Sequence, residues 1–149
     1  MKEVSLVPFE EIDKVKWNSC VHYAVNGNIF GYHWYLTNAV RHWDALVYDD
    51  YETIFFFFFR NTFPGMKELY QPLLVGKLGV YSVNMVTKNK VNRMLEAIPD
   101  TYQGMHVQLN DINRLDEATP LQYSENKDHS LYLKPSDDQL YGNYSRQLK

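Results

Sequence analysis

The sequence lacks most of the features from which a protein class is usually inferred. Its single cysteine, Cys20, excludes an internal disulfide and a cysteine-based zinc site. No long apolar run is present, which predicts neither a signal peptide nor a membrane-spanning helix. The net charge is −3, without the clustered Lys/Arg face that nucleic acid requires. We therefore expect a cytoplasmic protein without a nucleic-acid partner or a membrane span.

Catalytic motifs are also missing. No GxxxxGK[ST], GxGxxG, HExxH, GxSxG or CxxC pattern occurs, so no nucleotide cradle, zinc hydrolase site or serine elbow is predicted. The five histidines have no metal-ligand spacing, and we predict structural or surface roles for them and no metal site: His22, His33, His42, His106 and His129. Cys20 is predicted to be a packing residue unless its thiol is exposed.

Aromatic residues are abundant. The 149 residues include 12 Tyr, 8 Phe and 3 Trp, which favours one domain with a sheet-centred core. Periodicity and stop signals predict helices and strands in the order α-α-β-β-β-β-α-β-β-β. The predicted helices cover residues 10–24, 31–40 and 87–99, and the strands cover 43–50, 51–60, 69–74, 79–83 and 102–110, with two more in 118–135 around a turn at 124–129.

Two features of the predicted hairpin at residues 43–60 allow alternatives. Phe55–Phe59 do not alternate with polar residues, which is typical of a central strand covered on both faces; an exposed aromatic platform is the alternative. The acidic side chains of Asp49, Asp50 and Glu52 are interpreted as a solvated turn, with an acid/base group as the alternative.

An α/β (α+β) order with bent central strands resembles the GNAT acyltransferase fold, a mostly antiparallel bent sheet with helices on both faces. GNAT enzymes bind the coenzyme A pyrophosphate at a helix N-terminus through a [QR]-x-x-G-x-[GA] loop. Here "QPLLVGKLGVYSVNMVTKNK" contains Gly76 and Gly79 but no such match, because Leu74 stands three residues after Gln71. We predict that the glycines are bend residues and that residues 1–135 hold no cofactor; an atypical cofactor loop at Gly76–Gly79 is the alternative.

The stretches "KWNSCVHYAVNGNIFGYHWYL", "DALVYDDYETIFFFFFR", "YQPLLVGKLGVYS" and "SLYLKPSDDQLYGNYSRQLK" resemble the first half of bacterial FemAB-like proteins, which carry two GNAT-like domains in tandem. The resemblance implies that residues 1–135 form the first domain, and that an acyl-coenzyme A or aminoacyl donor binds in a second domain. Such proteins transfer an acyl or aminoacyl group to an amine. No catalytic residue can be assigned by position.

The final stretch begins with a capping box at Ser136–Gln139, and Leu140, Tyr144 and Leu148 continue an apolar stripe. We expect residues 136–149 to be the start of a helix that belongs to a second domain, with the chain as part of a longer protein.

The leading hypothesis is therefore a non-catalytic GNAT-like domain that supplies scaffold and one wall of an acceptor cleft, with a second GNAT-like domain as its partner. The candidate cleft residues, near bent strand ends, are Gln71, Lys77, Tyr81 and Ser82. Two alternatives stay open: a stand-alone atypical acetyltransferase, and a non-enzymatic interaction domain. An exposed apolar surface would allow a homodimer in either the leading or the interaction hypothesis.

Overall fold

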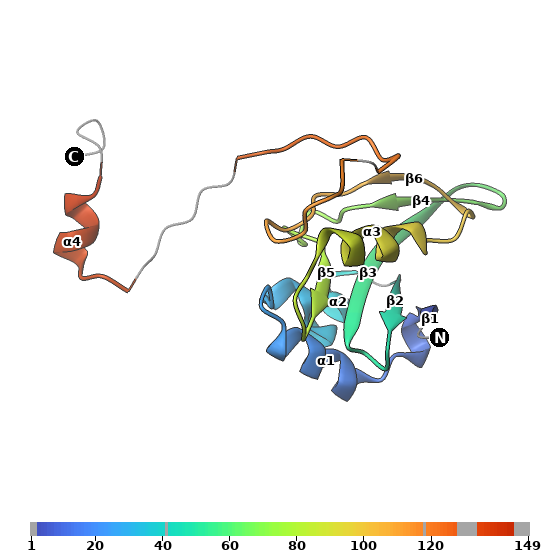
Figure 1. The fold of residues 1–149 in the computed structure, drawn as a ribbon, viewed down its shortest axis with the longest axis horizontal. Helices are drawn as coiled ribbons and strands as arrows, with labels where there is room; N and C mark the ends of the chain where they lie inside the picture. The colour runs from blue at the N-terminus through green and yellow to red at the C-terminus, as the bar shows by residue number, and fades with distance from the viewer. Residues whose placement is uncertain (1–2, 41, 118, 128–133, 145–149) are drawn as a thin grey trace. The chain divides into compact units, whose positions relative to one another are not determined.

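The computed structural model describes residues 3–40, 42–117, 119–127 and 134–144. Clustering of contacts divides the chain into two compact units, residues 1–119 and 120–149. The described part of the second unit contains one helix, α4 (Asp137–Gly142). The first unit contains, in order, β1 (Val4–Pro8), η1 (Phe9–Glu11), α1 (Lys14–Tyr23), η2 (Ile29–Gly31), α2 (His33–Ala39), β2 (Trp43–Tyr48), β3 (Thr53–Phe63), β4 (Met66–Tyr70), β5 (Val80–Ser82), α3 (Lys88–Glu96) and β6 (Tyr102–His106), as Figure 1 shows.

The first unit is built on one mixed sheet. Its strand order is β1-β2-β3-β4-β6, and β5 pairs with β3 beside this path. All pairs are antiparallel except β4 and β6, which are parallel and are joined through α3. β4 pairs with the second half of β3 and β5 with its first half, so β4 and β5 act as one interrupted strand along β3. This confirms the predicted mixed fold with a mostly antiparallel sheet.

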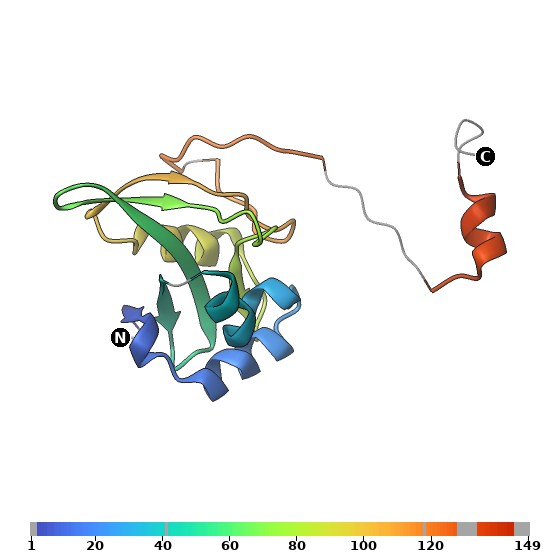
Figure 2. The same ribbon diagram turned by 180° about the vertical axis from the view of Figure 1, so that it is seen from behind.

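Helices cover both faces of this sheet. Figure 1 shows α3 in front of the strands, and Figure 2 shows α1 and α2 in front when the molecule is turned round. Trp17 of α1 and Leu36 of α2 belong to one buried cluster with Phe56 and Phe58 of β3. Val91, Met94 and Leu95 of α3 are buried outside that cluster.

The phenylalanine run is the central strand that the sequence predicts. Phe55, Phe56, Phe57 and Phe58 are fully buried, and successive residues point to opposite faces. Phe56 and Phe58 join the cluster of α1 and α2, whereas the Phe57 ring lies 5.1 Å from the ring of Tyr102 on the other face. The absence of alternation therefore reflects a strand with two dry faces, and the exposed-platform interpretation is wrong for these four residues.

The start of α1 and the β2–β3 turn are joined by a hydrogen bond and an ion pair. Asp13 caps α1 by accepting hydrogen bonds from Val15 N and Lys16 N, while its own backbone N–H donates to the Tyr51 hydroxyl at 2.8 Å. Lys16 pairs with Asp50 at 2.6 Å. The turn needs such support because Asp49, Asp50 and Tyr51 all have left-handed φ angles, of 50° to 70°.

Three expectations about element boundaries are wrong. The strand expected at 69–74 is β4, Met66–Tyr70, because β3 continues to Phe63 and a tight turn at Pro64–Gly65 starts the return strand early. Strand β1 was not predicted. No strand forms in residues 119–127, where the first of the last two strands was expected; the second of these strands and His129 lie largely outside the described residues.

Helix α4 starts as predicted, with Ser136 N donating to the Gln139 side chain. It ends at Gly142, and Asn143 is its C-cap. The expectation of a helix continuing through Tyr144 is therefore wrong, because Gly-Asn is a helix-stop pair that interrupts the apolar stripe. Leu148 lies outside the described residues.

Candidate functional site

Polar side chains gather, largely removed from water, where β5 ends and α3 begins. Ser82 is the last residue of β5, and Thr87 caps α3 by accepting a hydrogen bond from Lys90 N at 3.2 Å. Glu52 reaches the same place from the β2–β3 turn, because Thr53 and Ser82 are directly opposite in the β3–β5 ladder. Two stretches distant in sequence, residues 52–53 and 82–90, thus bring polar side chains together.

One carboxylate organises these side chains, which we call the Glu52 cluster: Glu52, Thr53, Ser82, Asn84 and Lys90. Glu52 Oε1 accepts hydrogen bonds from Lys90 Nζ at 2.9 Å, Asn84 Nδ2 at 2.9 Å and Ser82 Oγ at 3.0 Å. Lys90 Nζ also lies 3.1 Å from Ser82 Oγ. The Glu52 and Lys90 side chains are only 17% and 21% exposed, so this ion pair is largely removed from water.

The charges of the Glu52 cluster are fixed by their contacts. Burial alone would raise the pKa of Glu52, but the hydrogen bonds from Lys90, Asn84 and Ser82 outweigh it and lower the pKa to about 2. Glu52 is therefore an ionised acceptor and not a proton donor at neutral pH. Ser82 is fully buried against this carboxylate, so its hydroxyl is not placed as an exposed nucleophile. This arrangement indicates a structural role for the cluster. The interpretation of Glu52 as part of a solvated turn is wrong, since its side chain turns inward.

A second polar group, which we call the Val80 lock, closes the outer edge of β5. It consists of Asn26, Gly79, Val80, Asn110 and Asn113. The Asn113 side chain accepts from Val80 N at 2.5 Å and donates to Val80 O at 3.1 Å. Asn26 Nδ2 donates to the same carbonyl at 2.9 Å. A side-chain amide thus takes the place that the backbone of another strand would occupy.

Gly79 is required by this close contact. A Cβ built at Gly79 would lie 2.1 Å from Asn110 Nδ2, which is buried and has no hydrogen-bond acceptor among the described residues. A Cβ at Gly76 would lie 3.2 Å from the Phe30 ring, a much milder contact. Packing against other segments therefore explains Gly79 better than backbone flexibility does.

The structure does not bring the four predicted cleft residues into one wall. The Gln71 side chain stabilises the loop that follows it. Its Nε2 donates to Val75 O and Gly76 O at 2.8 and 3.0 Å, and its Oε1 accepts from Gln108 N. Tyr81 is fully buried, stacks on Phe56 and donates to Asn28 Oδ1 at 3.1 Å. Ser82 belongs to the Glu52 cluster, and the half-buried Lys77 lies in the loop before β5. Burial also raises the pKa of the Tyr81 hydroxyl, which makes it a poor acid.

Two other titratable residues are buried in the core. Burial raises the pKa of the Cys20 thiol to about 12, and the Glu52 carboxylate acts in the same direction. Cys20 is therefore a packing residue, as predicted. His33 packs against Phe9 and Trp43, and burial, assisted by Lys14, lowers its pKa. Its Nε2 has no partner within the described part of the chain.

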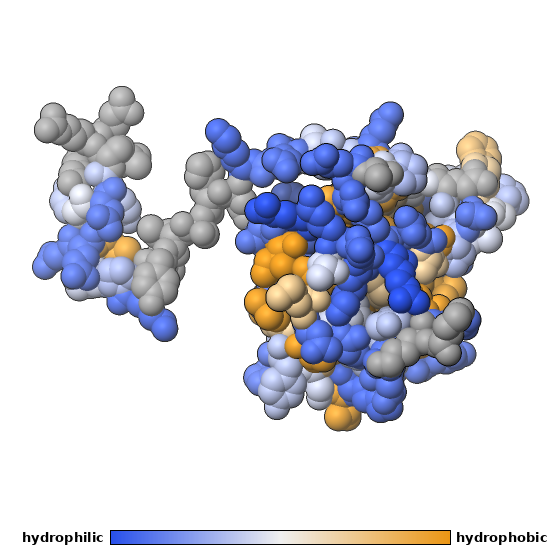
Figure 3. Space-filling model, viewed as in Figure 1, coloured by the Kyte–Doolittle hydropathy of each residue, from blue (hydrophilic) through white to orange (hydrophobic). Residues whose placement is uncertain are grey.

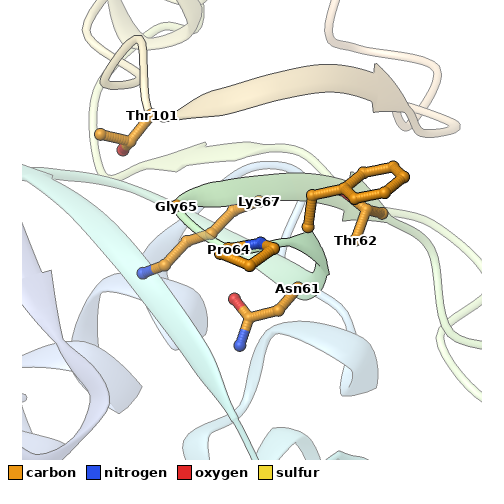
Figure 4. Close-up of a pocket in the computed structure, with 7 residues that line it drawn as sticks. Asn61, Thr62, Pro64, Gly65, Lys67 and Thr101 are labelled. Carbon is orange, nitrogen blue, oxygen red and sulfur yellow. The ribbon is translucent and has the colours of Figure 1, made fainter.

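Two hollows open on the surface. The larger, about 510 Å³, lies at the tip of the β3–β4 hairpin. Figure 4 shows Asn61 and Pro64 at this tip and Thr101 on the segment before β6. Its one charged lining group is Lys67, whose Nζ lies 4.3 Å from the centre of the Phe59 ring. The smaller hollow, about 200 Å³, lies beside the Glu52 cluster and is lined by Tyr48, Asn89, Lys90, Arg93 and Met94.

Neither polar group was anticipated as a whole. The predictions from sequence include Ser82 and Gly79 but not Asn26, Asn110 or Asn113. The "NGN" stretch at 26–28 is the local sequence signal for the Val80 lock, because asparagine and glycine together favour a fixed turn.

Comparison with known proteins gives no relative: no family model, curated protein or solved structure matches the chain significantly. In the described ranges, no group of three or more His, Cys, Asp or Glu side chains is placed to hold a metal ion. No helix in those ranges combines the length and hydrophobicity needed to cross a membrane.

Proposed function

We propose that residues 1–119 form a GNAT-like domain of a FemAB-like N-acyltransferase. In this proposal the domain supplies scaffold and one wall of an acceptor cleft, while the acyl-coenzyme A or aminoacyl donor binds in a second GNAT-like domain. The order of elements supports the proposal. After β1 come two helices, four strands, a helix and a final strand whose pairing is parallel, and this order resembles that of the GNAT fold.

The Val80 lock is the observation that carries the non-catalytic assignment. An extended acyl donor that carries amide groups would bind beside α3 by pairing with a free strand edge, as extended peptides do. At Val80 both backbone groups already bond to Asn113, and the carbonyl also bonds to Asn26. An acyl donor would have to displace the buried side-chain amide of Asn113. Its own hydrogen bonds to Val80 would at best equal those that are lost.

The start of α3 supports the same conclusion. In GNAT enzymes the coenzyme pyrophosphate lies on the free N–H groups of a helix N-terminus. Here Thr87 already accepts from Lys90 N, and Glu52 places its own negative charge on Lys90 Nζ. A pyrophosphate approaching this point would meet a carboxylate that is ionised at neutral pH.

The acceptor wall in this proposal runs along the loop of residues 71–77, where Gln71 and Lys77 are partly exposed. Tyr81 and Ser82 are fully buried in β5 and would support the wall without lining it. Gln71 fixes the loop through three hydrogen bonds, which would keep the wall rigid.

Titration of the 149-residue chain with acetyl-coenzyme A tests the non-catalytic assignment. We expect no rise in Tm, since a site filled at a hundred times its Kd would add about 2.7 kcal/mol to the free energy of unfolding. A clear, saturable rise in Tm would contradict the proposal and favour the stand-alone acetyltransferase.

Amide NMR tests the acceptor wall. We expect a short peptide with a free lysine amine to shift signals of residues 71–82, and the same peptide with an acetylated lysine to shift them much less. Equal shifts with both peptides, or shifts spread over the whole domain, would contradict an amine-acceptor site.

A non-enzymatic interaction domain is the second candidate, because one apolar surface is unusually exposed. Leu73 is 98% exposed, Leu74 63% and Trp34 53%, and the Tyr35 hydroxyl holds Leu74 O at 2.6 Å. Figure 3 shows hydrophobic side chains exposed on the face that it displays, beside mostly hydrophilic ones. Such a surface is typical of association sites.

Sedimentation velocity tests whether the chain forms a homodimer through this surface. We expect concentration-dependent association that Leu73→Ser weakens and that Val15→Ser, a control on α1 with 76% exposure, leaves unchanged. Association that is equal in both variants would contradict this use of the surface.

A further inference from the structure

The loop between α1 and η2 contains Asn26–Gly27, the chain's one Asn-Gly pair. Asparagine before glycine can react without an enzyme, because glycine has no side chain to hinder attack by its backbone nitrogen. That nitrogen attacks Cγ of the asparagine, a ring C–N bond forms, and the side-chain nitrogen leaves as ammonia. Water then opens the cyclic imide at either carbonyl and leaves aspartate or isoaspartate.

In the folded chain both reacting groups are hydrogen-bonded to other atoms, which hinders their reaction with each other. The nucleophile is engaged, because Gly27 N donates to Ala24 O at 3.0 Å. The amide is engaged too, because Asn26 Nδ2 donates to Val80 O at 2.9 Å and the residue is only 9% exposed. Asn28 Nδ2 also donates to Asn26 O at 3.3 Å, which restricts the backbone between them.

Packing requires both residues of this pair. A Cβ at position 27 would lie 2.1 Å from Val21 O, so no other residue fits without moving α1. Position 26 needs a side-chain donor for the Val80 carbonyl, and an ionised aspartate has none. The fold thus depends on a pair that is chemically labile wherever it is released.

We propose that Asn26 is a deamidation site gated by the Val80 lock, protected in the native state and reactive when β5 loosens. Deamidation would replace a hydrogen-bond donor by a carboxylate facing a carbonyl oxygen in a buried position. The lock would then not re-form, and local opening would become irreversible.

Peptide mapping by mass spectrometry tests this in the full chain, incubated near neutral pH with and without a denaturing concentration of urea. Because reaction requires opening, we expect Asn26 to deamidate at least about tenfold more slowly in the native state than in urea. A free peptide of residues 23–31, which carries the same Asn-Gly pair without the fold, is the control and should react equally in both. Equal native and unfolded rates at Asn26 would overturn the proposal.

The gate itself is tested with Asn113→Ala, which removes one partner of Val80 but leaves the Asn-Gly pair intact. We expect this variant to deamidate faster than the wild type in buffer and at the same rate in urea. An unchanged rate in buffer would show that the lock does not control the reaction. If the variant does not fold, the wild-type rate in urea below its unfolding midpoint decides, since it must rise with urea if opening is required.

Consequences of the reaction are tested with Asn26→Asp, which copies one product. We expect a lower unfolding midpoint than for the wild type, and no change for the matched Asn61→Asp. A midpoint equal to the wild type for Asn26→Asp would overturn the claim that deamidation unlocks β5.

Discussion

Replacing Glu52 by glutamine tests the electrostatic argument about the Glu52 cluster most directly. Glutamine keeps the size and one carbonyl oxygen, but it removes the charge that holds Lys90, Asn84 and Ser82. The pKa of Glu52 falls from 4.5 to about 2 on folding. At 1.36 kcal/mol per pKa unit, this corresponds to about 3 kcal/mol of native-state stability, an upper figure because the side chain keeps some contact with water.

The sign of the pH dependence follows from the lowered pKa. Between pH 4.5 and about 2 the unfolded state binds the proton more readily, so the stabilisation is complete above pH 4.5 and is lost as the pH falls towards 2. We expect Glu52→Gln to lose about 2–3 kcal/mol at pH 7 and about 1 kcal/mol or less at pH 2.5. Urea unfolding of both proteins at several pH values measures this difference.

The exposed ion pair between Lys16 and Asp50 provides the control. Asp50→Asn removes the partner of Lys16 in an exposed pair, with side chains 47% and 74% exposed, and should cost less than about 0.5 kcal/mol. Equal destabilisation by Glu52→Gln at pH 7 and pH 2.5 would contradict an electrostatic role of Glu52. That result would mean that packing, and not charge, accounts for the effect.

Three further predictions concern the core. Gly79→Ala should cost about 1–3 kcal/mol in chemical denaturation, because its Cβ would clash with the Asn110 amide; a stability within 0.5 kcal/mol of wild type would show that the Val80 lock can relax. Phe57→Ala should cost about 3–5 kcal/mol, while Phe63→Ala, at a site 69% exposed, should stay within about 0.5 kcal/mol. Since burial lowers the pKa of His33, the unfolded state takes up the proton first, so stability should fall as the pH drops below about 6.5. Its substitution by Gln should flatten the stability profile between pH 5 and 7, and an unchanged slope would contradict this origin.

Sequence patterns predicted the elements that depend on neighbouring residues. The Phe55–Phe58 strand, the helix predicted over residues 87–99 and the capping box at Ser136 all follow from short-range rules, and each is present. Strand β1 did not follow from such rules, because its partner β2 is separated from it in the sequence by two helices.

The candidate site was harder to predict for the same reason. Glu52 lies in a run of acids that looks like any solvated turn, and only the opposite position of Ser82 and the start of α3 makes it a buried acceptor. Asn113 lies in a polar stretch outside regular structure, and its role depends on the backbone of Val80, which is distant in sequence. Side chains that bond to distant backbone leave no periodic pattern.

The position of the phenylalanine run within the β2–β3–β4 meander has a consequence for folding in the cell. A nascent chain that exposes five consecutive phenylalanines is prone to intermolecular strand pairing. Strand β2, however, has already been synthesised when the run appears, and β4, which pairs with Phe58 and Phe59, follows after a short turn, while β5 pairs with Phe55 later. Local pairing of this kind is fast, so the most adhesive segment of the chain spends the shortest time without partners.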